Sequence, residues 1–413
     1  MSTISASTTT TTAFGVTADT TGALVFQTGA SPTTALTLSS AQVVTLANSL
    51  PEASGGTGTN TGYYGFKNRI INGAMVIDQR NAGAQMSGSI AGSYTLDRWL
   101  YDATQNSKVT IQQNAGSVTP PVGFLNYLGV TSTSAYSIGA GDLFNIAQYI
   151  EGFNTSDLAW GTANAATVTL SFRVYSSLTG TFGGALQNNA RTQSYPFTYS
   201  IPVANTWTTI SVTIAGSTTG TWVGATNGRG LSVFLGLGVG STYSASAGSW
   251  ASGDYRGATG ATSVVGTNGA TFYITGVQLE KGSTATSFDY RPYGTELNLC
   301  YRYYYSMFYG ASSSSTYVLG TACAYNGAIG IATIQFPVSM RTNPALYQTS
   351  GTGYFRFTGQ ATNVTFDSLA LNNPANCNTA DITNNTSVSI TQGSAYILRV
   401  ASTSATVAFG AEL

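Results

Sequence analysis

Aromatic and small polar residues alternate in one short stretch, residues 241–257 (STYSASAGSWASGDYRG). Aromatic faces stack on the C–H groups of sugar rings, and carboxylates, amides and hydroxyls bind sugar hydroxyl groups. A second tryptophan, Trp222, lies in a similar Gly/Ser/Thr-rich loop earlier in the chain. The same aromatic side chains would also suit packing against a neighbouring subunit. The residues predicted to contact a carbohydrate are Trp222, Tyr243, Trp250, Asp254, Tyr255 and Arg256.

The remaining tryptophans have other contexts. Trp207 opens a strand-like run and Trp99 lies in another, so we expect both to pack in a core. Trp160 follows a loop, and its position fits either role. An Asn-rich stretch, residues 371–385 (LNNPANCNTADITNN), is a competing contact region. Its amides could bind sugar hydroxyls, but Asn is also an ordinary turn former.

Catalytic chemistry has little support in the sequence. The chain has no histidine, which excludes Ser–His and Cys–His catalysis and histidine-ligated metals. Glycosidases need two carboxylates at a set separation, and the 15 acidic residues are scattered without a motif. We therefore predict no enzyme activity, no catalytic residue, no metal site and no cofactor. The acidic residues weighed for that role are Asp97, Asp102, Glu151, Asp157, Asp254 and Glu280.

The three cysteines, Cys300, Cys323 and Cys377, are widely spaced and match no CxxC metal or redox pattern. An odd number also argues against a complete disulfide framework. We expect buried free thiols.

Charge is scarce, since 7% of residues are charged against about 25% in ordinary soluble domains. With 15 basic and 15 acidic residues, the formal net charge is zero. Nucleic-acid binding by phosphate neutralisation needs a basic patch, and anionic membranes attract polybasic runs, so neither partner is expected. The sequence has no apolar run of 18 residues and no secretory signal at its start, so we predict no membrane insertion and synthesis in a cytoplasm.

Period-2 alternation of apolar side chains dominates residues 66–290 and predicts half-buried strands separated by Gly- and Asn-rich turns. Many such strands at short spacing predict a two-sheet sandwich, and a jelly roll is the favoured topology. The clearest strands are residues 167–175, 207–214, 231–237 and 270–279.

The flanking segments are also predicted to be all-β. Residues 1–65 contain short strand-like runs in a Ser/Thr matrix, with too little apolar area to offset the ordering entropy alone. They are either disordered or intertwined with other copies, and we favour a fibrous shaft or anchor. Residues 291–413 predict a second β domain at the distal tip, entered through a short helical turn near residues 296–300 and a Tyr-rich run. Its predicted strands are residues 328–336, 353–357, 364–368, 387–390 and 395–400.

Several ordered motifs resemble bacteriophage tail-fibre proteins with a carbohydrate-binding-module-like jelly roll of the galactose-binding-like type. The central motifs are NGxMxIDQR (residues 72–80), YTLDRW (94–99), VTLSFRVY (168–175), FYITGVQLEKG (272–282) and RPYGTEL (291–297). In the N-terminal segment, ADTTGALVFQTG and LPEASGGTGTNT are similar to shaft-and-linker segments of trimeric phage fibres.

This resemblance implies a homotrimer in a virion, made in a bacterial cytoplasm and joined to other virion proteins through residues 1–65. It also implies attachment to host surface polysaccharide or lipopolysaccharide. The alternative is a purely architectural fibre or decoration protein of a phage head or tail, with no receptor contact.

Overall fold

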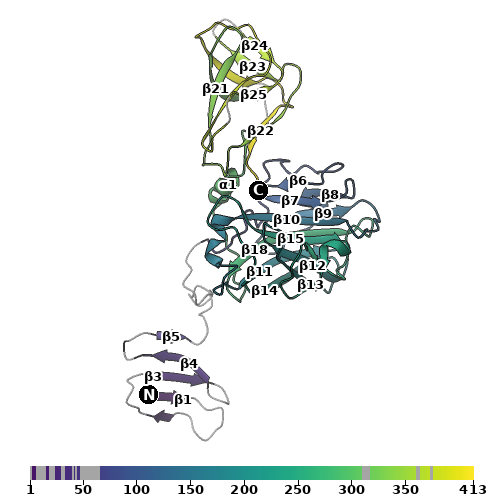
Figure 1. Ribbon diagram of the computed structural model, residues 1–413, viewed down its shortest axis with the longest axis vertical. Helices are drawn as coiled ribbons and strands as arrows, with labels where there is room; N and C mark the ends of the chain where they lie inside the picture. The colour runs from purple at the N-terminus through teal and green to yellow at the C-terminus, as the bar shows by residue number, and fades with distance from the viewer. Residues whose placement is uncertain are drawn as a thin grey trace. The chain divides into compact units, whose positions relative to one another are not determined.

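A computed structural model describes residues 2–5, 15–17, 24–28, 33–39, 41, 44–46, 66–308, 317–359, 363–372 and 375–413 (Figure 1). The chain divides into two compact units, Met1–Lys67 and Asn68–Leu413. The predicted all-β class is confirmed, because the described residues contain one α-helix, α1 (Tyr293–Tyr301), among many strands.

The N-terminal unit is one sheet with the strand order β2-β1-β3-β4-β5. Its last three strands confirm the short strands expected there. Residues 51–56, where Pro and Gly predict a turn, lie outside the described residues. Whether this segment is a shaft stays a prediction. The strands are β1 (Ser2–Ser5), β2 (Gly15–Thr17), β3 (Leu24–Thr28), β4 (Thr33–Leu38) and β5 (Val44–Leu46).

Two antiparallel sheets follow in the second unit. The six-stranded sheet has the order β13-β12-β15-β10-β7-β6, formed by β6 (Ser93–Leu96), β7 (Trp99–Ala103), β10 (Leu143–Glu151), β12 (Gly180–Gln187), β13 (Ser194–Ile201) and β15 (Arg229–Val239). The five-stranded sheet has the order β14-β11-β18-β9-β8, formed by β8 (Val109–Gln113), β9 (Leu128–Ser132), β11 (Val168–Ser176), β14 (Thr208–Ile214) and β18 (Thr271–Lys281).

The chain path through these sheets confirms the jelly roll. From β9 onward the chain changes sheet at each step except between β12 and β13, which form a hairpin. The eight strands concerned therefore pair as β9-β18-β11-β14 in one sheet and β10-β15-β12-β13 in the other. Two interleaved sets of four strands are the arrangement of a double-sheet jelly roll.

Alternating apolar side chains from both sheets meet in one core. Phe172 of β11 and Leu235 of β15 are fully buried there, as is Trp99, which confirms its predicted role. The predicted strands at 167–175, 207–214, 231–237 and 270–279 correspond to β11, β14, β15 and β18. The sequence did not single out β10, because all nine of its residues are buried and its pattern does not alternate.

Short elements complete the jelly roll. The 3₁₀-helices η3 (Gly152–Asn154) and η4 (Ser156–Leu158) follow β10, and η5 (Ser241–Tyr243) follows β15. A small parallel pair, β16 (Ser244–Ala245) and β17 (Gly257–Ala258), packs on β12, β13 and β15. A further 3₁₀-helix, η2 (Ala115–Ser117), lies beside β9.

The C-terminal part is a second sandwich with its own apolar core, to which Phe355, Leu398 and Phe409 belong. Its three-stranded sheet has the order β19-β28-β22, with β19 (Tyr304–Ser306), β22 (Ala345–Thr349) and β28 (Thr406–Gly410). Its larger sheet has the order β24-β23-β27-β20-β21-β26-β25, with β20 (Val318–Ala324), β21 (Gly330–Gln335), β23 (Phe355–Thr358), β24 (Asn363–Phe366), β25 (Leu369–Leu371), β26 (Thr379–Asn384) and β27 (Ala395–Val400).

One predicted strand in this part, residues 387–390, is wrong. Val388 and Ile390 donate their backbone N–H groups to Ala328 and Gly327, in the loop between β20 and β21. The segment therefore lies against a turn and forms no strand ladder. The predicted helical turn near residues 296–300 is confirmed within α1.

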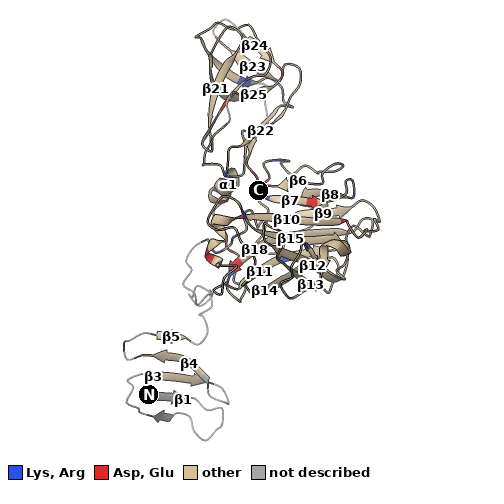
Figure 2. Cartoon of the chain, in the orientation of Figure 1, with Lys and Arg blue, Asp and Glu red and all other residues tan. Residues whose placement is uncertain are grey.

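Ion pairs join the two sandwiches. Arg80 Nη2 lies 2.7 Å from Glu412 Oε1, and buried Arg98 binds the other oxygen of the same carboxylate. Glu151 accepts hydrogen bonds from Arg302 Nε at 2.9 Å and from the Tyr303 hydroxyl at 2.6 Å. Burial by itself raises the pKa of Glu151, but these hydrogen bonds leave it below its ordinary value. In Figure 2 the positions of Lys, Arg, Asp and Glu are few and spread over the ribbon. The ion pairs described here connect residues that are far apart in the sequence.

A second contact between the sandwiches runs through Gln79. Its backbone N–H and side-chain Nε2 donate to Asp97 at 2.7 and 2.6 Å. The same amide donates to the Tyr304 carbonyl at 2.8 Å and accepts from the Ser306 N–H at 3.0 Å. Burial raises the pKa of Asp97 to about 7, although Arg80 and the Gln79 hydrogen bonds act against the shift. Asp97 therefore titrates close to neutral pH.

The cysteine prediction holds for one residue. Cys300 is a buried free thiol, and burial raises its pKa well above the ordinary value. The prediction is wrong for Cys323, which is exposed, and for Cys377, which is half-buried. Cys323 is exposed because it alternates with buried Ala322 and Ala324 along β20 and so lies on the outer face. In the described part of the chain, no three Cys, Asp or Glu side chains cluster as metal ligands, and no helix is long and apolar enough to span a membrane.

Candidate functional site

The structure does not bring the six predicted carbohydrate-binding residues together, and most of them fall into two groups. Trp222 and Trp250 join Trp160 at the side of the main core, where all three pack. Asp254 and Arg256 instead form an ion-pair cluster with other charged residues, described below. Neighbours in the sequence are therefore not neighbours in one site.

The tryptophan cluster consists of Trp160, Trp222 and Trp250, whose rings meet edge to face. Ring centroids are 4.8 Å apart for Trp160 and Trp222, 5.3 Å for Trp160 and Trp250, and 5.5 Å for Trp222 and Trp250. Each indole N–H donates to a backbone carbonyl, with N–O distances of 2.7 to 3.0 Å. Trp160 is buried, while Trp222 and Trp250 are half-buried. The three rings are thus held by packing and hydrogen bonds, and Trp222 and Trp250 keep part of their surface accessible to solvent.

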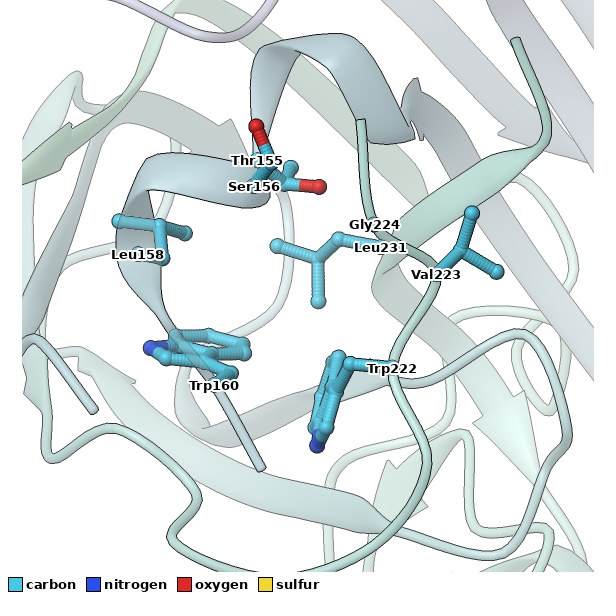
Figure 3. Close-up of a pocket in the computed structure, with 8 residues that line it drawn as sticks. All are labelled: Thr155, Ser156, Leu158, Trp160, Trp222, Val223, Gly224 and Leu231. Atoms are coloured by element: carbon cyan, nitrogen blue, oxygen red, sulfur yellow. The ribbon is translucent and has the colours of Figure 1, made fainter. Parts of the chain in front are cut away.

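A pocket of about 70 Å³ opens beside this cluster. In Figure 3 the rings of Trp160 and Trp222 stand on one side and the Leu231 side chain points toward the middle of the group. Indole and aliphatic side chains form most of the wall, and two hydroxyl-bearing residues complete it. The lining residues are Thr155, Ser156, Leu158, Trp160, Trp222, Val223, Gly224 and Leu231.

Two glycines let the pocket walls approach each other. A Cβ on Gly152 would lie 2.3 Å from the Gly224 carbonyl oxygen and 2.9 Å from Val223 Cγ1. Gly161 has a φ of +86°, and a Cβ there would lie 2.9 Å from the Trp222 ring. Side chains are excluded at both positions by close backbone and ring contacts, and at Gly161 also by backbone conformation. These glycines therefore fix the distance between the 152–161 segment and the loop that carries Trp222.

Asn188 holds the Trp222 loop from the other side. Its Nδ2 donates to the Thr221 carbonyl at 3.0 Å, and its Oδ1 accepts from the N–H groups of Thr192 and Gln193 at 2.9 and 3.0 Å. A buried amide bonded to three backbone groups ties the β12–β13 turn to the loop before β15. Trp222 thus projects from a loop that is braced on both sides.

The Arg256 cluster, formed by Arg256, Asp102, Asp254 and Arg191, is the second group. Arg256 is 8% exposed and lies 2.7 Å from Asp102 and 2.9 Å from Asp254. Burial by itself raises the pKa of Asp254, but hydrogen bonds from Arg256 and Gln187 hold it below its ordinary value. We expected Arg256 to contact a ligand, but the structure buries its guanidinium between two carboxylates.

The Arg256 cluster closes the outer face of the six-stranded sheet. The Arg256 guanidinium carbon lies 5.5 Å from the ring centroid of Phe234 on β15 and 5.6 Å from that of Tyr243. Asn145 of β10 pairs in register with Asp102 of β7 and is fully buried, and neither atom of its side-chain amide has a hydrogen-bond partner. Residues of the 241–257 loop therefore pack on this face of the sheet. Tyr243 therefore packs against Arg256 in this cluster.

Tyr255 belongs to neither group. It is half-buried, and its backbone N–H donates to Ser194 Oγ at 3.1 Å. Its ring lies against Gly253. These contacts anchor the loop to β13 and give Tyr255 no shared surface with the pocket-lining residues.

The Asn-rich stretch 371–385 behaves as a set of turns where it is described; residues 373 and 374 lie outside the described residues. Asn376 Oδ1 accepts from the backbone N–H groups of Asn378 and Thr379 at 2.8 and 2.9 Å. Asn384 is buried and donates to the carbonyls of Ala328 and Thr386. These side-chain amides form hydrogen bonds with backbone groups, as Asn side chains in turns commonly do.

The sequence did not decide the role of one pocket-lining residue, Trp160, and it did not point to several others. Trp160 fitted core or site equally well, and the structure places it in the main core and in the wall of the pocket. Leu158 and Leu231 carry no signal beyond apolarity. Trp207, expected in the core, is half-buried and packs on Tyr127 and Tyr175 outside the five-stranded sheet.

No protein-family model matches the chain, and no curated protein matches it in sequence. Solved structures that align with it include carbohydrate-binding modules. A family 61 module in complex with β-1,4-galactotriose is 8% identical over 52% of this chain and all of its own, with a TM-score of 0.27. A family 11 module of a Clostridium thermocellum cellulase is 11% identical over 49% of this chain and 98% of its own, with a TM-score of 0.24.

A tandem pair of family 22 modules from Paenibacillus barcinonensis is 10% identical over 80% of this chain and 97% of its own, with a TM-score of 0.24. Identities this low and TM-scores below 0.5 establish neither a common family nor a common ligand. The jelly roll described above therefore stands on the strand order of this chain alone.

Proposed function

We propose that this protein binds glycans on a host-cell surface as part of a phage attachment fibre. The observation that carries the proposal is the Trp160–Trp222 pocket, which opens at the surface of the jelly roll. It combines aromatic and aliphatic walls with the hydroxyl-bearing residues Thr155 and Ser156. Apolar walls with a few polar groups are the usual composition of a small-ligand site, and indole rings in such a wall suit sugar C–H groups.

In this proposal the protein binds glycans and does not cleave them. The acidic residues weighed as catalytic groups are committed to other contacts. Asp102 and Asp254 pair with Arg256, Glu151 pairs with Arg302, and Asp157 pairs with Arg69 at 2.7 Å. Asp97 accepts two hydrogen bonds from Gln79, and Glu280 accepts them from Gln278 and Thr286. None of these carboxylates lines the pocket.

The virion setting rests on the motif resemblance at residues 72–80, 94–99 and 291–297 and on the Ser/Thr-rich N-terminal segment. In this proposal residues 1–65 join the protein to other virion components and support assembly of a homotrimer. The low charge of the chain fits a protein that works within a larger particle.

Binding of the fluorescently labelled full chain to an array of bacterial polysaccharides and lipopolysaccharides tests the proposal. We expect saturable binding to a subset of glycans and to intact bacteria that carry them. Trp222→Ala should weaken this binding at least tenfold. Absence of binding to every glycan and cell by folded protein would contradict the proposal and favour an architectural fibre.

Trp207→Ala is the matched control. Trp207 is half-buried like Trp222, contacts two aromatic rings and donates its indole N–H to a backbone carbonyl at 2.9 Å. It lines no part of the pocket. Its replacement should leave glycan binding unchanged.

A further inference from the structure

We infer that the Trp160–Trp222 pocket selects a small, uncharged, methyl-bearing substituent on a sugar, such as an N-acetyl group or the methyl of a 6-deoxy sugar. This inference rests on the proposed glycan-binding function and adds the chemical group that the pocket takes. The rest of the sugar lies outside the pocket, where the accessible parts of Trp222 and the loop backbone contact it.

The size of the pocket sets the first limit. An engineered cavity of about 150 Å³ holds a benzene molecule, with six heavy atoms. A pocket of about 70 Å³ therefore suits three or four heavy atoms. A whole pyranose ring is too large, whereas an acetyl group or a methyl group with its ring carbon fits.

The walls set the second limit. Leu158, Trp160, Trp222, Val223 and Leu231 present carbon atoms, and no charged residue lines the pocket. Placing a charged group against such walls without a partner is unfavourable, while burial of a methyl group is favourable. The pocket therefore discriminates against carboxylate and phosphate substituents.

Charges close by in the sequence do not alter this selectivity. Asp157 lies between the lining residues Ser156 and Leu158, but its carboxylate is 2.7 Å from Arg69 and 3.7 Å from Lys281. It is therefore neutralised by two cations outside the pocket. Neither an anionic nor a cationic sugar gains a partner from this pair inside the pocket.

Two of the lining residues carry hydroxyl groups, which in this inference bind the polar part of an acetamido group. Thr155 and Ser156 carry hydroxyls, and the Thr155 hydroxyl makes a long contact of 3.4 Å to the Gly152 carbonyl. Such a weakly held hydroxyl can turn toward a ligand with little loss. A 6-deoxy sugar would use the apolar walls alone.

Saturation-transfer NMR with the full chain tests the inference. The probes are N-acetyl-D-glucosamine and L-fucose, and the comparison sugars are D-glucose and L-galactose, which carry no methyl group. We expect the strongest saturation on the acetyl or C6 methyl protons of at least one probe, and binding about tenfold tighter than its comparison sugar. Which probe responds distinguishes N-acetyl from 6-deoxy recognition.

Two variants give the controls. Gly224→Leu adds a side chain in open space at the pocket wall, since a Cβ there meets no atom within 4 Å. It should fold normally and lose the methyl saturation, whereas Trp207→Ala should keep it. The inference would be overturned if probe and comparison sugars bound equally, or if Gly224→Leu left the methyl signal unchanged. Binding on the array would still support glycan recognition in either case. If the folded protein bound no glycan on the array, the proposed function itself would be overturned.

Discussion

The tryptophan cluster and the Arg256 cluster receive side chains from the same loop, yet they have opposite properties. Trp250 packs with two other indoles beside an open, uncharged pocket. Arg256, six positions later, is buried between two carboxylates on a closed sheet face. The comparison teaches that alternating aromatic and polar residues in a loop do not define one site. Partners from distant strands decide which residues remain available to a ligand.

The two regions also depend on different forces. Packing of rings and burial of apolar surface hold the tryptophan cluster together, so its stability is insensitive to pH and salt. Charge pairing holds the Arg256 cluster, where loss of one partner leaves another charge buried. Substitutions in the tryptophan cluster should therefore affect ligand binding, whereas substitutions in the Arg256 cluster should affect stability alone.

Trp160→Ala should have the largest effect. Trp160 is buried and contacts both other indoles, so its removal leaves a cavity at the side of the core. We expect a loss of about 4 kcal/mol in the free energy of unfolding, together with loss of glycan binding. Urea denaturation measures the first, and a loss below about 1 kcal/mol would show that the ring is not a structural support.

Arg256→Ala should lower the free energy of unfolding by about 3 kcal/mol, because it leaves Asp102 and Asp254 without their shared cation. Glycan binding by the folded fraction should not change. Arg191→Ala is the control within the same cluster, since Arg191 is 52% exposed and 3.9 Å from Asp254, and should cost under about 1 kcal/mol. Weaker glycan binding by folded Arg256→Ala would place the Arg256 cluster in the site after all.

A pH series distinguishes the charged interior from the uncharged pocket. Because the pKa of Asp97 is raised from 3.8 to about 7, the native state holds a proton that the unfolded state releases. The stability from this group is therefore greatest at low pH and is lost as pH rises through 7, by about 2 kcal/mol between pH 5 and 8. Denaturation midpoints should show this slope in the wild type and not in Asp97→Asn, while glycan affinity stays constant. An affinity that follows the slope would link the pocket to the junction between the sandwiches.

Gly152→Ala should lower the free energy of unfolding by about 2 kcal/mol, because its Cβ would lie 2.3 Å from the Gly224 carbonyl oxygen and the backbone of the Gly224 loop must shift. That shift moves the Val223 wall of the pocket, so binding should weaken several-fold. Calorimetric titration would measure it. Unchanged affinity would mean that the ligand does not use this wall.

Much of the fold follows from alternation in the sequence. Strands such as β11 and β18 bury alternate side chains in the main core, and their period-2 pattern predicts them directly. Strand β10 escapes this reasoning because both of its faces are covered. The segment at 387–390 shows the opposite error, since an alternating run can lie against a turn and form no ladder.

The candidate site was predictable only in part. The aromatic residues in Gly/Ser/Thr-rich loops led to Trp222, which lines the pocket, and to Trp250, which packs against Trp222. The partnership with Trp160 was not predictable, because 62 positions separate it from Trp222 and the jelly-roll topology alone brings them together. The burial of Arg256 also depends on Asp102, which lies on a distant strand.

Isothermal titration of the best-bound array glycan into wild type, Trp222→Ala and Trp207→Ala tests the central claim most directly. The account predicts that Trp222→Ala weakens affinity at least tenfold while Trp207→Ala binds like the wild type, with all three proteins equally folded. Equal affinity for wild type and Trp222→Ala would contradict the claim that glycans bind at the tryptophan pocket.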